Sequence, residues 1–237
     1  MYLLAIDTET TGLDINTDDI LELGYAIYHI DNPAPIRMKS FFLTNKKPIE
    51  PIITEITHIT QDIIDKAAIN PTDAFNELVS DMIHFDIKWF VGQNIVEYDY
   101  PILKNNFKRC GLAVPEVRLL DTKTDVAYTV KSKSMSLTYI AADHGFINPF
   151  PHRALTDAMT CMVLLYKYDI RKCLDVAETP MIEIRADVNF DSRDLAKALQ
   201  YNWDADRKIW VKKIREYNLK QETQKASFQV IVLRKNG

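Results

Sequence analysis

Two carboxylates near the N-terminus have a spacing that suits metal chemistry. The stretch from Tyr2 to Ile6 is mostly apolar and predicts a short buried strand, and Asp7 and Glu9 follow it at alternate positions. Alternate residues of an extended chain point to the same side. Two buried acids are costly unless a cation neutralises them, and oxygen-rich acidic sites suit Mg2+ or Mn2+. The alternative is a strand end with two solvated acids.

Three further residues extend this set. Asp99 lies in the segment Phe90–Leu103, and His152 and Asp157 lie in the segment Pro151–Ala158. Four carboxylates brought together would repel one another unless divalent cations compensate their charge. Histidine titrates near neutral pH, so it suits a general base that takes a proton from water. The alternative for a lone histidine in a loop is a surface residue.

The order of these residues resembles a known family. Asp-x-Glu, a later Asn and Asp, and then His-x-x-x-x-Asp resemble the DEDDh branch of the DnaQ-like 3'-5' exonucleases. The resemblance covers about residues 1–170. The related DEDDy branch has a tyrosine four residues before its last aspartate, where this chain has Arg153. The histidine branch is therefore the match.

The resemblance implies a fold and a set of site residues. The implied fold class is α/β, with a ribonuclease H-like mixed five-stranded sheet flanked by helices. The implied chemistry is hydrolysis with two divalent cations, Mg2+ or Mn2+. The implied catalytic residues are Asp7, Glu9, Asp99, His152 and Asp157, of which the four carboxylates are the metal ligands and His152 is the general base. The implied substrate-binding residues are Thr10, Thr11, Leu13 and Asn94, for which the alternatives are turn and core positions.

The implied function is release of nucleoside 5'-monophosphates from the 3' end of nucleic acid, with single strands or frayed ends as substrate and DNA favoured over RNA. One alternative is a non-catalytic nucleic-acid-binding or scaffolding protein on the same fold. The presence of all five signature residues argues against it. Another alternative is an enzyme restricted to very short oligonucleotides. It keeps the chemistry and changes the substrate, and the sequence leaves it open.

Composition sets the broad class. The chain has 237 residues, of which 47% are hydrophobic and 26% charged, so it can bury a sizeable core and is not disordered. Its three cysteines have neither metal-ligand spacing nor the pattern of a disulfide framework, which suits a reducing compartment. No apolar run approaches the length of a membrane helix, and the N-terminus lacks the basic region of a signal peptide. The expected location is cytoplasmic.

Local patterns predict the elements that position these residues. Their alternation of strands and helices is typical of an α/β domain. His58, in the segment 54–60, is interpreted as a surface residue. The strands are expected at residues 2–6, 20–30, 36–43, 88–92 and 117–121, and the helices at residues 73–85, 100–110, 136–144 and 155–170.

The segment 174–180 is interpreted as a boundary between an exonuclease domain, residues 1–175, and a small basic α+β module, residues 181–237. The module carries 12 Lys and Arg against 8 Asp and Glu, a net charge of +4, whereas residues 1–180 have a net charge of −8. A basic appendage could attract phosphates, and the alternative is a solvated surface. Aromatic residues alternate with cations in the module, which suits nucleic-acid binding or the module's own core. The aromatic residues are Tyr201, Trp203, Trp210 and Tyr217.

Overall fold

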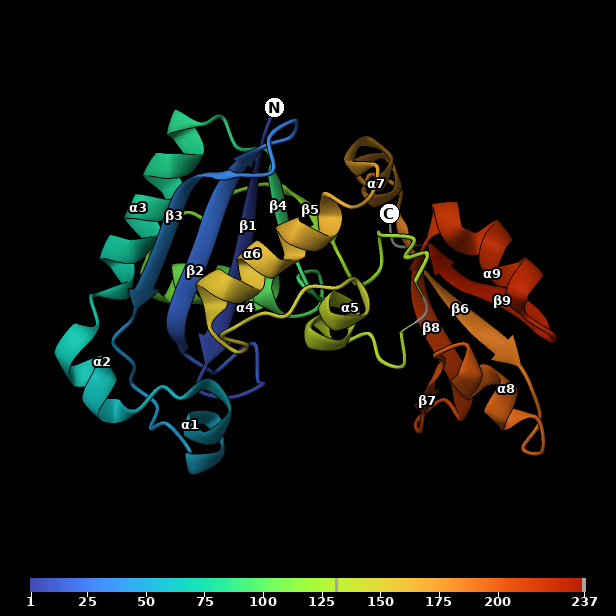
Figure 1. Ribbon diagram of the computed structural model, residues 1–237. Helices are drawn as coiled ribbons and strands as arrows, with labels where there is room; N and C mark the ends of the chain where they lie inside the picture. The colour runs from blue at the N-terminus through green and yellow to red at the C-terminus, as the bar shows by residue number, and fades with distance from the viewer. Residues whose placement is uncertain (131, 236–237) are drawn as a thin grey trace. The chain divides into compact units, whose positions relative to one another are not determined.

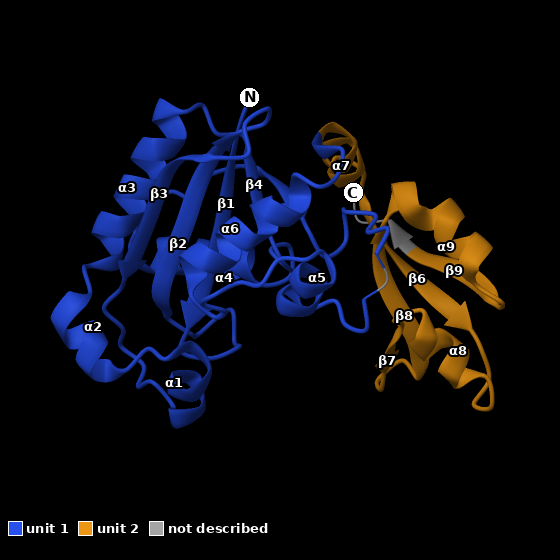
Figure 2. Ribbon diagram, in the orientation of Figure 1, with its two compact units in different colours: residues 1–170 blue, residues 171–237 orange. Residues whose placement is uncertain are grey.

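A computed structural model describes residues 1–130 and 132–235. The chain forms two compact units, residues 1–170 and 171–237 (Figure 2). The sequence placed a boundary segment at residues 174–180, but helix α7 (Ile170–Ala177) occupies most of it. Within the described residues, no helix combines the length and the apolar character that crossing a membrane requires.

The first unit is built on one five-stranded sheet (Figure 1), with strand order β3-β2-β1-β4-β5. The pairs β1–β2 and β2–β3 are antiparallel, whereas β1–β4 and β4–β5 are parallel. The predicted mixed sheet is therefore confirmed. The strands are β1 (Tyr2–Thr10), β2 (Ile20–His29), β3 (Pro35–Phe42), β4 (Trp89–Gly92) and β5 (Arg118–Asp121). The helices are α1 (Pro51–Thr57), α2 (Gln61–Ala67), α3 (Pro71–His84), α4 (Asp99–Arg109), α5 (Leu137–Asp143) and α6 (Ala154–Leu165).

The two faces of the sheet have different tasks. Leu4 and Ile6 of β1 lie in the main core with residues of α3 and α4, where Phe75 stacks on Phe107 at 4.4 Å between ring centroids. The odd-numbered residues of β1 point to the opposite face by strand alternation. Helix α6 crosses β1 and β2 on that face (Figure 1). Leu4 and Ile6 thus fix β1 to the main core, while Asp7 and Glu9 lie on the face that α6 crosses.

Two predicted element boundaries were wrong. Strand β1 does not end before Asp7 but continues to Thr10, because β2 pairs with it along its whole length. The helix expected to run to Ile170 stops at Leu165. Its end tightens through bonds three residues apart, such as that from the amide of Tyr168 to the carbonyl of Leu165. The ring of Tyr168 packs edge-on against other aromatic rings of the first unit, which holds the chain in this turn.

The second unit has its own sheet and core. Its antiparallel sheet has the order β7-β8-β6-β9, and a small apolar cluster that includes Ile182, Ile184 and Tyr201 lies against it. The sequence predicts strands at residues 183–188, 209–214 and 228–232 and a helix at residues 193–201 in this unit, whereas the short elements β7, η1 and α9 were not predicted. The strands are β6 (Met181–Asp187), β7 (Asn202–Asp204), β8 (Ile209–Arg215) and β9 (Gln229–Lys235), and the helices are α8 (Arg193–Ala198), the 3-10 helix η1 (Glu216–Asn218) and α9 (Leu219–Lys225).

The aromatic residues of the second unit divide between core and surface. Tyr201 is buried and Trp210 packs against the core, whereas Trp203 and Tyr217 are each about half exposed. Two of the interleaved cations are held by acids of the same unit. Arg207 pairs with Glu183 and Asp204, and Lys212 pairs with Glu222. The core interpretation therefore holds for Tyr201 and Trp210.

Candidate active site

Strand β1 presents Asp7 and Glu9 on the α6 side of the sheet. Their register partners on β2 are Gly24 and Glu22 respectively. Thr8, between them, is buried and points to the opposite face by alternation. The two acids therefore lie within the paired part of the strand rather than beyond its end, and the sheet fixes their spacing.

Asp99 is tied to the same strand from the opposite face. It is the first residue of α4, and its side chain is buried. One carboxylate oxygen, Oδ1, accepts hydrogen bonds from the backbone amide of Thr8 at 3.1 Å and from the Thr8 hydroxyl at 2.7 Å. Both hydrogen bonds go to Oδ1 and fix the orientation of the carboxylate. The second oxygen, Oδ2, accepts neither of these two bonds.

A buried acid at the end of β5 shapes the loop before α4. The carboxylate of Asp121 accepts hydrogen bonds from the backbone amides of Asn94 and Val96, at 2.9 and 3.3 Å. Asn94 has a left-handed backbone with φ of 61°. Its side-chain oxygen accepts a hydrogen bond from Lys123 at 2.9 Å. Asp121 thus holds the segment that leads to Asp99, and Asn94 lies at its start.

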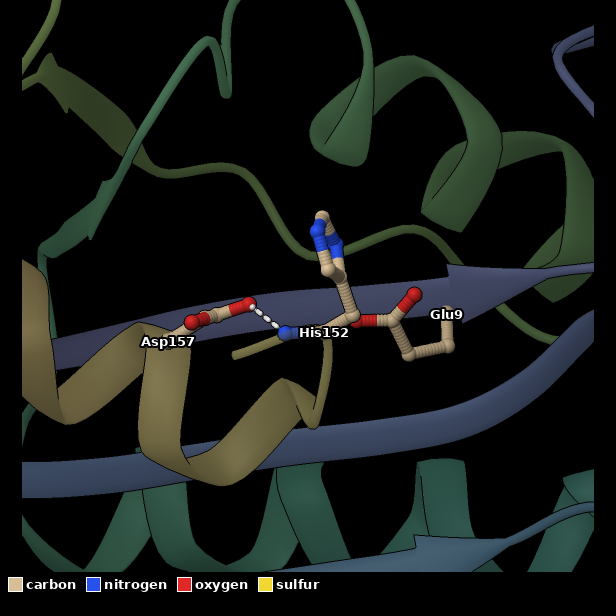
Figure 3. Close-up of side chains that lie close together, drawn as sticks. All are labelled: Glu9, His152 and Asp157. Carbon is tan, nitrogen blue, oxygen red and sulfur yellow. Dashed lines mark hydrogen bonds between the residues drawn. The ribbon is translucent and has the colours of Figure 1, made fainter. Parts of the chain in front are cut away.

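Asp157 and His152 come from the first turn of α6 and the loop before it (Figure 3). The backbone amide of His152 donates to Oδ2 of Asp157 at 2.9 Å, and the side chain of Asn148 donates to Oδ1. His152 is exposed and has a left-handed backbone with φ of 60°. One potential ligand atom from each of Glu9, His152 and Asp157 lies within 4.8 Å of the others. The loop and the strand therefore meet at Glu9.

The close approach of α6 to the sheet depends on a glycine. A Cβ atom added to Gly24 would lie 2.1 Å from the backbone nitrogen of Leu155 and 2.4 Å from the carbonyl carbon of Ala154. Only a residue without a side chain fits there. Because Gly24 is the register partner of Asp7, this contact brings the first turn of α6 directly over the acids of β1.

An ion pair fixes the start of α6 from the same strand. Glu22 is only 1% exposed and binds Arg153 through two hydrogen bonds, of 2.9 Å to Nε and 3.1 Å to Nη2. The backbone amide of Ala154 donates to the same carboxylate at 3.3 Å. Two contacts from β2 therefore hold the start of α6: Gly24 lies against its backbone, and Glu22 binds Arg153 and the amide of Ala154.

The carboxyl groups of the site strongly disfavour their charged forms. Burial is the largest cause in each case. It raises the pKa of Glu9 to about 8, of Asp99 to about 7 and of Asp157 to about 6. The pKa of Asp7 is raised well above its usual range, first by burial and then by the charges of Asp99, Glu9, Asp157 and Glu22. Asp7 is thus the electrostatic centre of the cluster.

The mutual repulsion of these acids suits a site that binds divalent cations. The main influences on the pKa of Asp7 all raise it, and none of them is a cation of the protein. Carboxylate oxygens are the ligands that Mg2+ and Mn2+ prefer. Bound cations would supply the positive charge that the cluster lacks. The residues present therefore fit the metal that the sequence predicts.

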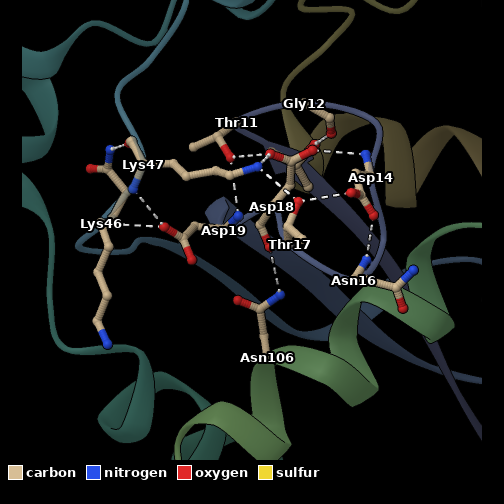
Figure 4. Close-up of polar contacts among 12 residues, drawn as sticks. Thr11, Gly12, Asp14, Asn16, Thr17, Asp18, Asp19, Lys46, Lys47 and Asn106 are labelled. Atoms are coloured by element: carbon tan, nitrogen blue, oxygen red, sulfur yellow. Dashed lines mark hydrogen bonds and ion pairs between the residues drawn. The ribbon is translucent and has the colours of Figure 1, made fainter.

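The loop after β1 is held by an acid of its own (Figure 4). Asp18 accepts hydrogen bonds from the Thr11 hydroxyl at 2.9 Å, from the backbone amide of Asp14 at 2.7 Å and from Lys47 at 2.8 Å. Leu13, at the tip of this loop, is 86% exposed. A large apolar side chain is therefore presented to solvent on a fixed backbone.

The two threonines predicted to bind substrate are engaged within the protein. Thr10 and Thr11 are buried. The hydroxyl of Thr10 donates to the carbonyl of Gly12 at 2.7 Å and lies 2.6 Å from the hydroxyl of Tyr98. The backbone amide of Thr11 donates to the carbonyl of Asp19 at 3.0 Å. Both residues build the loop that carries Leu13, and direct substrate contact by either one stays a prediction.

The five residues expected to be catalytic thus come together from β1, α4, the first turn of α6 and the loop before it. The residues that support them were missed. Glu22 gave a signal, since it is the single acid in an otherwise apolar strand sequence. Nothing local in the sequence singles out Thr8. The missed supporting residues are Thr8, Glu22, Gly24, Asp121, Asn148 and Arg153.

Comparison with known families identifies the fold. Residues 4–165 match the model of the RNase_T family, described as exonuclease. The sequence is 26% identical over 206 residues to a protein of Staphylococcus saprophyticus named 3'-5' exonuclease DinG, which covers 84% of this chain. It is 30% identical over 165 residues to the protein of the same name from Staphylococcus aureus, which covers 68% of this chain. The matches span only 22% and 17% of those longer proteins.

Solved structures share the architecture. E. coli ExoI in complex with single-stranded DNA, in its zinc-bound form, superimposes with a TM-score of 0.70 at 14% identity, over 96% of this chain and 68% of that chain. The nuclease domain of 3'hExo, described as a DEDDh family member and bound to rAMP, gives a TM-score of 0.57 at 17% identity, over 75% of this chain and 94% of that chain. The ribonuclease H-like fold is confirmed.

Proposed function

Because this chain belongs to the exonuclease family, which its residues 4–165 match, we propose that it hydrolyses phosphodiester bonds from the 3' end of nucleic acid. One observation carries the proposal. The pKa of Asp7 is raised by burial and by neighbouring acids, which include Glu9 of the same strand, Asp99 of α4 and Asp157 of α6. Such a cluster is unfavourable in a merely structural role, and it suits a site that binds cations.

Two divalent cations, Mg2+ or Mn2+, are part of the proposal. Asp7, Glu9, Asp99 and Asp157 would hold them, because their carboxylates suit these cations and lie close enough to affect the pKa of Asp7. When bound, such a pair would lower the pKa of a water molecule and neutralise charge on the phosphate. The protein contributes fixed carboxylate positions, through Thr8 for Asp99 and through Asn148 for Asp157.

His152 is the proposed general base. Its ring is on an exposed loop, and its backbone is held by the bond from its amide to Asp157. The imidazole would take a proton from the attacking water. The water oxygen forms the new bond to phosphorus, the bond from phosphorus to the 3' oxygen breaks, and that oxygen gains a proton. The products are a nucleoside 5'-monophosphate and a strand shortened by one nucleotide.

The proposed substrate is a single strand or a frayed 3' end, with DNA favoured over RNA. The ExoI structure that covers 96% of this chain is a complex with single-stranded DNA, which supports this choice. The exposed Leu13 would separate the last bases as an apolar wedge. Asn94, bonded to Lys123, would contact the strand near the site. Thr10 and Thr11 would offer backbone groups to the terminal nucleotide from the rigid loop that carries Leu13.

A cytoplasmic location belongs to the same proposal. The three cysteines of the chain lack the sequence pattern of a disulfide framework, which suits a reducing compartment.

The test is a degradation assay with the purified chain. DNA and RNA strands labelled at the 5' or the 3' end are incubated with Mn2+, Mg2+ or EDTA. We expect a ladder that shortens the 5'-labelled strand from its 3' end, with release of monophosphates and no cleavage in EDTA. Cleavage that persists in EDTA contradicts the metal mechanism.

The same assay separates the alternatives. A length series that starts at two nucleotides distinguishes a general exonuclease from an enzyme that cuts only very short oligonucleotides. A protein that binds strands tightly but releases no monophosphate with either metal would instead be a binding or scaffolding protein.

A further inference from the structure

The carboxylate of Glu22 is unusual for a strand in the middle of a sheet. It receives four hydrogen bonds: two from Arg153, one from the amide of Ala154 and one from the Ser40 hydroxyl at 2.7 Å. A two-bond contact between Arg and a carboxylate fixes orientation as well as distance. Leu21 and Leu23, on either side of Glu22, are fully buried apolar residues.

A contribution to stability does not by itself explain why a buried acid stands at position 22. Replacing a buried ion pair by apolar side chains is often neutral or stabilising, because taking the charges out of water is costly. Glu22 also lies opposite Glu9, whose charged form it disfavours. Because Glu22 is desolvated and repels Glu9, we look for its role in the segment that it positions.

The segment that Glu22 holds is the one that begins with His152. The left-handed backbone of His152 is strained for a residue with a side chain, and such a conformation persists only when its surroundings impose it. Two contacts impose it here. The amide of His152 is bonded to Asp157, and the next two residues, Arg153 and Ala154, are both bonded to Glu22.

We propose that Glu22 is a positioning residue of the reaction. Through Arg153 and the amide of Ala154, it holds the backbone of His152 so that the imidazole reaches the attacking water. This inference rests on the proposed function, in which His152 is the general base. Misplacing a catalytic group by about 1 Å can cost roughly 100-fold in rate. A residue that does not touch the substrate can therefore affect turnover by positioning one that does.

The test is a double-mutant cycle on turnover. Glu22→Gln, His152→Ala and the double variant are compared with the wild-type protein on a 5'-labelled single strand. We expect Glu22→Gln to lower kcat by about 10-fold to 100-fold while KM changes little. In the His152→Ala background the same substitution should lower kcat less than about twofold, since the residue it positions is gone.

Arg153→Lys provides a second variant that keeps the charge and loses the two-bond geometry. We expect Arg153→Lys to lower kcat, as is expected for Glu22→Gln, and to have little effect on kcat in the His152→Ala background. It also keeps the test decisive if Glu22→Gln does not fold.

Asp81 offers a matched control. It is 2% exposed, and it pairs with Arg37 and with the hydroxyl of Tyr25. The exposed fractions of the two arginine side chains are nearly equal, 37% for Arg37 and 38% for Arg153. Asp81→Asn and Glu22→Gln should both lower the Tm, but Asp81→Asn should leave kcat within about twofold of the wild-type value.

Three outcomes overturn the inference. Equal losses of kcat from Glu22→Gln in both backgrounds would show that Glu22 does not act through His152. A shift in the Mn2+ concentration for half-maximal activity that accounts for the loss would show that Glu22 acts through the metal-binding acids instead. A wild-type protein without exonuclease activity would defeat the proposed function itself, which makes that failure distinguishable from the first two.

Discussion

At the scale of single residues, the site has one electrostatic centre and one exposed base. The charged form of Asp7 is disfavoured by four acids, Asp99, Glu9, Asp157 and Glu22, and no cationic side chain is among its main electrostatic neighbours. His152 differs in kind, since its ring is exposed and its backbone is fixed. The two residues should therefore respond differently to substitution.

Asp7→Asn should abolish exonuclease activity and raise the Tm of the metal-free protein. Burial and the neighbouring acids make ionisation of Asp7 unfavourable in the folded state only, and Asn removes this cost, so the folded state becomes more favourable in EDTA. Activity assays with Mn2+ and thermal denaturation in EDTA check both parts. Asp81→Asn is the contrast, because it breaks a buried ion pair and should lower the Tm. An active Asp7→Asn protein would remove this residue from the centre of the mechanism.

His152→Ala should lower kcat by about 100-fold to 10,000-fold, the usual contribution of general-base catalysis. Substrate affinity should change little, because a base acts in the transition state. Steady-state kinetics on a single strand measure both quantities. His58→Ala is a close control, since His58 is also exposed and also has a left-handed backbone, with φ of 59°. Near wild-type turnover after His152→Ala would mean that another group is the base.

At the scale of elements, the site depends on contacts between β1, β2, α4 and α6. The strand β1 carries two acids on one face and, through Thr8 on the other, holds the acid of α4. The strand β2 carries no proposed ligand, yet it receives the start of α6 at Gly24 and Glu22. The position of α6 relative to β2 therefore decides whether Asp157 reaches the acids of β1.

Gly24→Ala tests that contact. The added methyl group would overlap the backbone of α6 at Leu155, so the helix must move away from β2. We expect a Tm lowered by several degrees and a kcat lowered at least tenfold, because a small displacement of catalytic groups is costly. Circular dichroism and single-strand kinetics give the two values. Wild-type kinetics in a folded Gly24→Ala protein would show that α6 tolerates displacement.

At the scale of the whole molecule, the acids make stability depend on pH and metal. The pKa values of Asp157, Asp99 and Glu9 are raised to about 6, 7 and 8. The folded protein therefore retains protons that the unfolded chain has already released. Since the folded state then binds more protons, its stability falls as the pH rises. Metal ions compete with those protons and should reverse the loss.

Thermal denaturation in EDTA should consequently give a Tm that falls between about pH 5 and pH 8. Added Mn2+ should raise the Tm more at the upper end of this range than at the lower end. The Asp7→Asn protein should show a smaller fall, because one of the acids whose pKa is raised by folding is gone. A metal-free Tm that rises with pH across this range would contradict the electrostatic description of the site.

The second unit gives a further prediction at this scale. Residues 181–237 have a net charge of +4, and the proposed catalytic residues all lie before them. A chain that ends at Pro180 should cleave very short oligonucleotides much as the full chain does. It should bind long strands more weakly and with less salt dependence, because fewer counterions are released. Kinetics on short and long strands at two salt concentrations decide this, and an unchanged salt dependence would refute a nucleic-acid role for the second unit.

The sequence by itself determined the features that depend on local order. The apolar start of β1, the alternation of Asp7 and Glu9 and the spacing of His152 and Asp157 follow from neighbouring residues, because strand and helix periodicities are local. The mixed five-stranded sheet followed from the resemblance that those residues carry. Element ends were less accurate, since pairing along β2 extended β1 and packing of Tyr168 ended α6.

Only the tertiary structure decided how the site is held. The contacts of Asp99 with Thr8 and of Arg153 with Glu22 join residues 91 and 131 positions apart. No local spacing encodes such pairs, because they exist only once the sheet and α6 have packed. The same applies to Gly24, whose importance comes from the helix that lies against it. The chain therefore encodes the reacting groups locally, while long-range packing between β1, β2, α4 and α6 gives them their geometry.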